Sequence, residues 1–106
     1  MPVANPNPFA RGDILMSTWG RDQDIVDFYQ VIRATPRTVV VRRIESRIIE
    51  IVSPTRAVIV PTLDVFRSEE QRRRIVHDGG DSYLRLSGWE RALLWDGVAL
   101  LSTRYA

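Results

Sequence analysis

Residues 25–44 read IVDFYQVIRATPRTVVVRRI, and the fold prediction starts from this stretch. Its two halves, Ile25–Ala34 and Thr38–Ile44, are rich in the β-branched and aromatic residues that favour strands. The connection Thr35-Pro36-Arg37 is short and places Pro36 at a position that turns favour for proline. The two halves therefore predict an antiparallel hairpin.

Two further hairpins are predicted downstream. Arg47–Val52 (RIIEIV) and Ala57–Pro61 (AVIVP) flank Ser53-Pro54-Thr55, and Pro61 should end its strand or mark an edge. Near the end of the chain, RALLW at 91–95 and VALLST at 98–103 flank Asp96-Gly97. This two-residue turn is typical of tight hairpins, and it is the strongest hairpin signal in the sequence.

Upstream, Ile14–Trp19 (ILMSTW) predicts a first strand and Gly20–Asp24 (GRDQD) a loop. The stretch from Leu63 to His77 has two interpretations. Ser68-Glu69-Glu70-Gln71 fits a helix capping box, which would allow one short helix near residues 68–76. Such a helix would have almost no apolar face, so we favour a hairpin of residues 72–77 with residues 82–87 across Asp78-Gly79-Gly80-Asp81.

These elements predict an all-β fold, a small antiparallel barrel or sandwich, with an SH3-like barrel favoured. The 106 residues suffice for one core, so we expect a flexible N-terminal tail over residues 1–10 and a single β domain over 11–106. The sequence has no signal peptide and no apolar run of membrane-spanning length, which favours a cytoplasmic location.

The residue types limit the chemistry. The chain has no cysteine and one histidine, so thiolate chemistry is excluded and we expect no metal and no cofactor. His77, with Asp78 or Asp81, is the basis of the least favoured hypothesis, a hydrolytic enzyme, because no nucleophile is distinctively placed. Asp22, Asp24 and Asp27 resemble only the start of a calcium loop. We therefore predict no catalytic residues.

All fifteen basic residues are arginine, although the net charge is only +2. Arginine suits bidentate contacts with phosphate. A nucleic-acid-binding β module is therefore the alternative function, and its candidate residues are Arg42, Arg43, Arg72, Arg74 and Tyr83. The competing interpretation is an ordinary solvated face with its arginines favoured by a GC-rich genome.

The favoured binding segment joins the first two predicted strands. It places a tryptophan at a strand end, then a glycine and polar residues, then a strand with an acid and a tyrosine. Polar loops held by a rigid sheet are common binding sites, although the same residues can serve the loop's own structure. The candidate residues are Trp19, Arg21, Asp22, Gln23, Asp27 and Tyr29.

The same segment resembles a family of small proteins of bacteriophages and other mobile elements. That family carries Gly-Asp-Ile, then Ser-Ser-Trp-Gly-Tyr-Asp-Gln-Thr-Asn-Val-Asp-Phe-Tyr-Gln-Val, and ends near Leu-Trp-Asp-Gly and Tyr-Ala. The matches here are Gly12-Asp13-Ile14, Ser17, Trp19-Gly20, Asp22-Gln23, Val26–Val31, Leu94–Gly97 and Tyr105-Ala106. Arg21 replaces the family's tyrosine, and Asp24-Ile25 its Thr-Asn.

The resemblance implies a mobile-element origin, and the arginine-only basicity suggests a phage of a GC-rich, actinobacterial host. The favoured function is a non-enzymatic phage accessory protein that binds a host or phage macromolecule in the host cytoplasm. A protein partner is slightly favoured over nucleic acid because the net charge is low.

Overall fold

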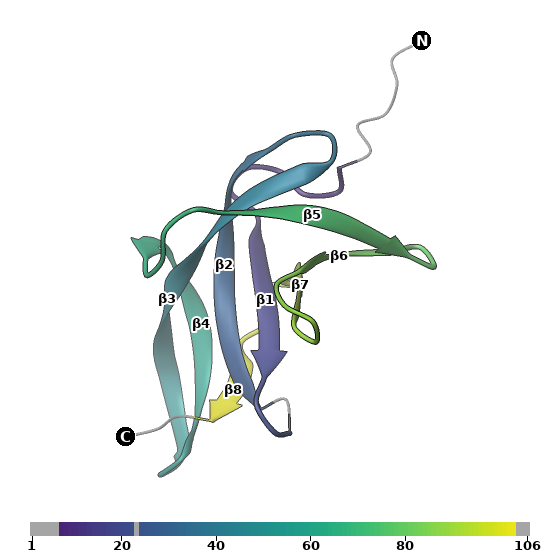
Figure 1. Cartoon of the computed structure of the whole chain (residues 1–106). Coiled ribbons are helices and arrows are strands. Elements are labelled where there is room, and N and C mark those ends of the chain that lie inside the picture. The colour runs from purple at the N-terminus through teal and green to yellow at the C-terminus, as the bar shows by residue number, and fades with distance from the viewer. Residues whose placement is uncertain (1–6, 23, 104–106) are drawn as a thin grey trace.

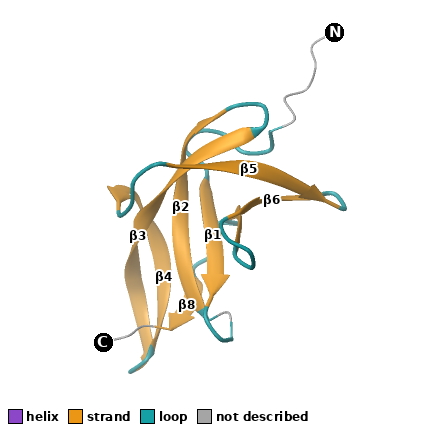
Figure 2. Cartoon of the chain, viewed as in Figure 1, coloured by secondary structure: helices purple, strands orange, loops and turns teal. Residues whose placement is uncertain are grey.

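The computed structural model describes residues 7–22 and 24–103, and these residues form eight strands and no helix (Figures 1 and 2). The strands are β1 (Ile14–Trp19), β2 (Ile25–Ala34), β3 (Thr38–Ser53), β4 (Arg56–Phe66), β5 (Gln71–Asp78), β6 (Asp81–Arg85), β7 (Arg91–Leu94) and β8 (Leu100–Thr103). The fold is therefore all-β, as predicted. The described part of the chain contains no helix that is long and apolar enough to cross a membrane.

Six strands close into a ring, which we call the six-strand ring. Strand β2 pairs with β1 and β3, β1 pairs with β7, and β7 pairs with β6. Strand β6 then pairs with β5, and β5 returns to β3. Every pairing is antiparallel, so the arrangement belongs to the predicted barrel or sandwich class.

A second, smaller enclosure lies on the other side of β2 and β3. The far half of β3 pairs with β4, and β4 pairs with β8. Strand β8 returns to the start of β2, where the Thr103 amide donates to the Asp24 carbonyl at 2.7 Å. The Val26 amide also donates to the Ser102 hydroxyl at 3.0 Å. Both bonds join residues nearly eighty positions apart, which makes β8 the strand that closes this enclosure.

Each enclosure has its own hydrophobic core, and β2 contributes to both. Successive side chains of a strand point to opposite faces. Tyr29 and Val31 therefore lie in the first core, inside the six-strand ring, whereas Val26 and Phe28 lie in the second core. The other buried members of the first core are Phe9, Leu15, Val39, Val41, Ile75, Leu84 and Ala92, and those of the second are Ile44, Ala57 and Ile59.

The three central hairpin predictions are confirmed. Strands β2 and β3 pair across residues 35–37, and β3 and β4 pair across the Ser53–Arg56 turn. Strands β5 and β6 pair up to Asp78 opposite Asp81. The alternative helix near residues 68–76 is therefore wrong. Ser68, which suggested a helix cap, accepts a hydrogen bond from the Arg43 amide instead, at 2.9 Å.

The predicted hairpin across Asp96-Gly97 is wrong. The local turn does form, because Asp96 accepts a hydrogen bond from the Val98 amide and Gly97 has a φ of +89°. The flanking strands nevertheless separate: β7 pairs with β1 and β6, whereas β8 pairs with β4. The turn would favour pairing of β7 with β8, but each of these strands pairs instead with strands of a different enclosure.

Of the two alternatives for Pro61, an edge position is the one observed. Strand β4 continues to Phe66, but β8 pairs only with Arg56–Ile59, so Pro61 has a partner strand on one side, where it faces Ser46. In the predicted flexible tail, residues 1–6 lie outside the described residues, but Asn7 and Phe9 are buried. The Asn7 side-chain Nδ2 donates to the Thr35 carbonyl at 2.6 Å, so this part of the tail is anchored on the β2–β3 turn.

The two-core arrangement predicts a large contrast between two leucines on strands. Leu84 is fully buried in the first core, whereas Leu101 is 47% exposed on β8. Leu84→Ala should lower the free energy of unfolding by about 2–5 kcal/mol, because it leaves a cavity. Leu101→Ala should lower it by less than about 1 kcal/mol. Urea unfolding measures both, and equal losses would contradict this core assignment.

Candidate functional site

The predicted binding segment is held together largely by its own contacts. Trp19 ends β1 and donates its indole N–H to the Asp27 carboxylate at 2.8 Å. The same carboxylate oxygen lies 4.0 Å from the Arg43 guanidinium of β3. The fold thus brings together two candidates of this segment, Trp19 and Asp27, and adds Arg43, a candidate of the nucleic-acid alternative.

Tyr29 lies in the first core and is only 6% exposed. Burial raises the pKa of its hydroxyl to about 12, and the nearby Glu90 and Asp27 carboxylates add to that rise. Arg43 and Arg73 act in the opposite direction. The ring of Tyr29 therefore supports the fold and does not form an outer contact surface.

The loop between β1 and β2 divides into anchored and exposed residues. Asp24 is anchored, because its carboxylate accepts a hydrogen bond from the Thr103 hydroxyl at 2.8 Å. Gly20 has a φ of +97°, and a Cβ there would lie 2.9 Å from the Asp24 carboxylate. Arg21 and Asp22 are exposed, and Gln23 lies outside the described residues. Of the described candidates in this segment, Arg21 and Asp22 remain fully available for contact.

A polar cluster fills one end of the six-strand ring, beside Tyr29. Glu90 precedes β7, and burial together with the Asp27 charge raises the pKa of its carboxyl. Arg43 and the Ser17 hydroxyl offset part of that rise. Ser17 is fully buried, and its hydroxyl makes no hydrogen bond of regular geometry within the described chain. The cluster brings polar groups into a ring whose buried core is apolar, and Arg73, on the same face of β5 as Ile75, also points inward with a buried Nε that makes no hydrogen bond to the described residues.

The residues of the nucleic-acid alternative do not form one surface. Arg42 packs its guanidinium 4.0 Å from the Phe66 ring and donates to the Ser68 carbonyl, whereas Arg43 points to the opposite face. Tyr83 is buried on β6. Arg72 and Arg74 are exposed on one face of β5 and are the two members that share a surface.

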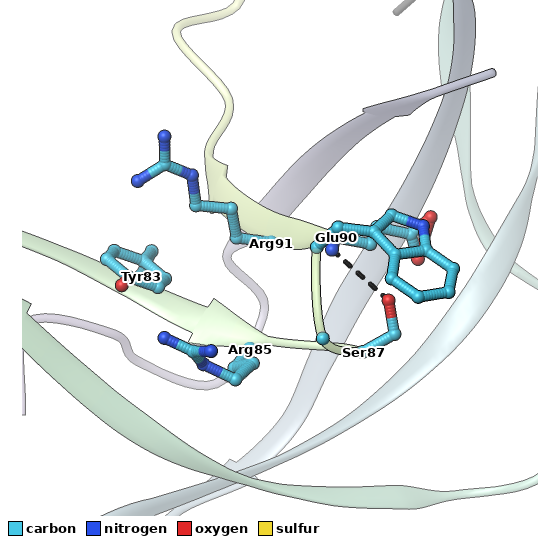
Figure 3. Close-up of a pocket in the computed structure, with 7 residues that line it drawn as sticks. Tyr83, Arg85, Ser87, Glu90 and Arg91 are labelled. Atoms are coloured by element: carbon cyan, nitrogen blue, oxygen red, sulfur yellow. Dashed lines mark hydrogen bonds between the residues drawn. The ribbon is translucent and has the colours of Figure 1, made fainter. Parts of the chain in front are cut away.

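That surface continues over residues that the sequence interpretation missed. Arg85 on β6 and Arg91 on β7 are directly opposite each other, and the Arg91 guanidinium lies 5.1 Å from the Tyr83 ring centre. Figure 3 shows these two arginines leaving neighbouring strands on the Tyr83 side of a shallow hollow of about 250 Å³. Alternation along the strand places Arg85 on the same face as Tyr83, and this could be predicted from the sequence. The neighbouring Arg91 could not, because the pairing of β6 with β7 was not predicted.

Exposed apolar side chains gather on the β3–β4 hairpin, which extends beyond the six-strand ring (Figure 1). Ile48 and Ile51 are opposite Ile59 and Ala57 and share their face, so they continue the second core past its end. Ile51 is 64% exposed. Beside them is a hollow of about 170 Å³, which we call the apolar groove; its lining is Ile25, Val26, Ser46, Ile48, Ala57, Ile59, Ser102 and Thr103.

The residues considered for catalysis and for metal binding each contact different neighbours and do not come together in one site. The His77 ring is exposed, and its Nδ1 lies 2.8 Å from the Ser82 hydroxyl across the β5–β6 hairpin, a partner the sequence interpretation missed. Asp78 and Asp81 pair with each other in the register at the turn. Asp24 and Asp27 contact Thr103 and Trp19, and the described residues contain no group of three histidine or acidic side chains placed to hold a metal.

The raised pKa of Glu90 predicts a pH-dependent effect on stability. A carboxyl group with a higher pKa in the folded than in the unfolded chain stabilises the fold at low pH, and this contribution is lost as the pH rises through the folded pKa. Glu90→Gln should therefore raise the free energy of unfolding at pH 7 relative to the unmodified chain, with no gain near pH 4. Urea unfolding at both pH values tests this. The exposed Glu69→Gln is the control, and a loss of stability at pH 7 in Glu90→Gln would contradict the assignment.

The chain was also compared with known proteins. No protein-family model, no curated protein and no solved structure matches it.

Proposed function

We propose that this chain is a non-enzymatic accessory protein of a bacteriophage or other mobile element, built on a small SH3-like barrel, that binds a protein partner. The observation that carries the proposal is the apolar groove with the exposed Ile48 and Ile51 beside it. The mobile-element origin rests on the sequence resemblance, and the setting in the host cytoplasm rests on that resemblance and on the location expected from the sequence.

The apolar groove is a suitable contact for a protein because it is an open continuation of a core. Ile48 and Ile51 project from the same face as the buried Ile59 and Ala57, yet they remain 45% and 64% exposed. Contiguous exposed apolar surface of this kind is typical of protein interaction sites. Burial of aliphatic side chains at about 25 cal/mol per Å² gives a partner a driving force that requires no net charge.

The lining of the groove also supplies polar contacts for a partner. Ser46, Ser102 and Thr103 line it beside the aliphatic residues. An apolar centre with a polar rim is the usual arrangement of a protein interface. The neighbouring Arg21 and Asp22 are exposed in the loop that precedes β2, whose first residue, Ile25, lines the groove. We therefore place the recognition surface at the groove and extend it towards this loop.

Affinity capture from infected host lysate tests the proposal. The double variant Ile48→Arg with Ile51→Arg should fold, because both side chains are at least 45% exposed, and it should lose the partner. A single buried charge at a protein interface typically costs several kcal/mol, which corresponds to more than a hundredfold loss of affinity. Circular dichroism and urea unfolding check that the variant is folded.

Val98→Arg is the control for an exposed aliphatic residue replaced by arginine, because Val98 is 60% exposed but lies in the connection between β7 and β8. It should capture the same proteins as the unmodified chain. Capture of the same proteins by the folded double variant would contradict a role for the groove.

A further inference from the structure

The outer face of β5, β6 and β7 carries a row of arginines that the proposed function does not use. Ile75, Leu84 and Ala92 point into the first core from these three strands. Because side chains alternate along a strand, the opposite face presents Arg72 and Arg74 from β5, Arg85 from β6 and Arg91 from β7. We call these four exposed residues the arginine face.

The arginine face forms no ion pair within the described chain. Arg33 and, with it, Arg42 and Arg72 lower the pKa of the Glu70 carboxyl, so only the charge of Arg72 is partly compensated by a nearby acid. Arg85 is directly opposite Arg91, and like charges in that position repel. The ion pairs among residues 7–22 and 24–103 are Arg33–Glu70, Arg43–Asp27 and Arg67–Glu45, so none involves this face. Asp78 and Asp81 occupy the same face only at its far end, in the β5–β6 turn. An anion placed between Arg85 and Arg91 would therefore relieve repulsion.

An exposed tryptophan, Trp89, lines the same hollow as Arg85 and Arg91. Trp89 is 85% exposed, the most exposed large apolar side chain of the described residues. It lies in the β6–β7 connection, which is held by bonds from the Leu86 and Ser87 amides to the Glu90 carbonyl, at 2.8 and 3.2 Å. The Glu90 amide donates to the Ser87 hydroxyl at 3.1 Å (Figure 3). The indole is therefore presented to solvent by an ordered turn.

We propose that the arginine face and Trp89 form a binding site for single-stranded nucleic acid. The arginines bind backbone phosphates, because the planar guanidinium matches two phosphate oxygens. Trp89 stacks on an unpaired base, and such stacking is available to any base. Stacking on an exposed indole requires a base that is not paired, which favours the single strand over a duplex. The site is separate from the apolar groove, so either proposal can fail alone.

Fluorescence anisotropy with a labelled oligothymidine of about fifteen nucleotides tests the proposal. The full chain should bind at low salt, and its affinity should fall as salt increases. Arg85→Ala with Arg91→Ala should weaken binding at least about tenfold. The same variant should reduce the slope of log affinity against log salt by about 1.4, or about 0.7 for each phosphate that is no longer neutralised. Arg47→Ala with Arg56→Ala removes the same charge from the β3–β4 hairpin and should change affinity less than about twofold.

Trp89→Ala separates stacking from charge. It should weaken binding about five- to a hundredfold without changing the salt slope, and Trp89→Phe should restore most of the affinity. The proposal would be overturned if the full chain did not bind at low salt, or if the two arginine pairs had equal effects. Tighter binding of a duplex of the same length, or equal competition by polyglutamate of the same charge, would also overturn it.

Discussion

The whole structure depends on burying both faces of β2. A strand that packs on one side only alternates apolar and polar residues, but β2 carries Val26 and Phe28 on one face and Tyr29 and Val31 on the other. A single sheet layer cannot cover both faces of such a strand. The chain covers one with the six-strand ring and the other with β4 and β8, and the long β3 is shared between them. The polar cluster beside Tyr29 lies at one end of the six-strand ring. The apolar groove beside Ile48 lies at the end of the second core.

Local sequence signals were sufficient for most strands and for three hairpins, because those turns join neighbouring strands that do pair. The signal at Asp96-Gly97 failed for a physical reason. Its turn has the expected local geometry, yet β1 and β4 each have an edge that needs a partner, and β7 and β8 fill those edges separately. A turn reports local backbone preference, whereas the choice of strand partner is made by the free energy of the whole fold.

The candidate site was predictable only in part for the same reason. The segment from Trp19 to Asp27 was recognised from its polar residues, and it does form a hydrogen-bonded unit. The sequence alone did not reveal that Tyr29 faces a core. Because β2 carries apolar residues on both faces, its pattern does not show which face is buried. Arg85 and Arg91 were missed because their proximity depends on the pairing of β6 with β7. A surface that forms only when distant strands pair in a particular register is difficult to predict from a single sequence.

The bonds from β8 to β2 have a consequence for the order in which the chain folds. Val26 meets Ser102 and Asp24 meets Thr103, so the second core is complete only when residues 100–103 reach a strand made nearly eighty residues earlier. The hairpins of β2–β3 and β5–β6 require only short loops to close and can form first. Contacts of such long sequence separation slow folding. Until they form, Phe28 and Ile59 stay open to solvent, and the nascent chain has a period in which it is prone to aggregate before its last strand arrives.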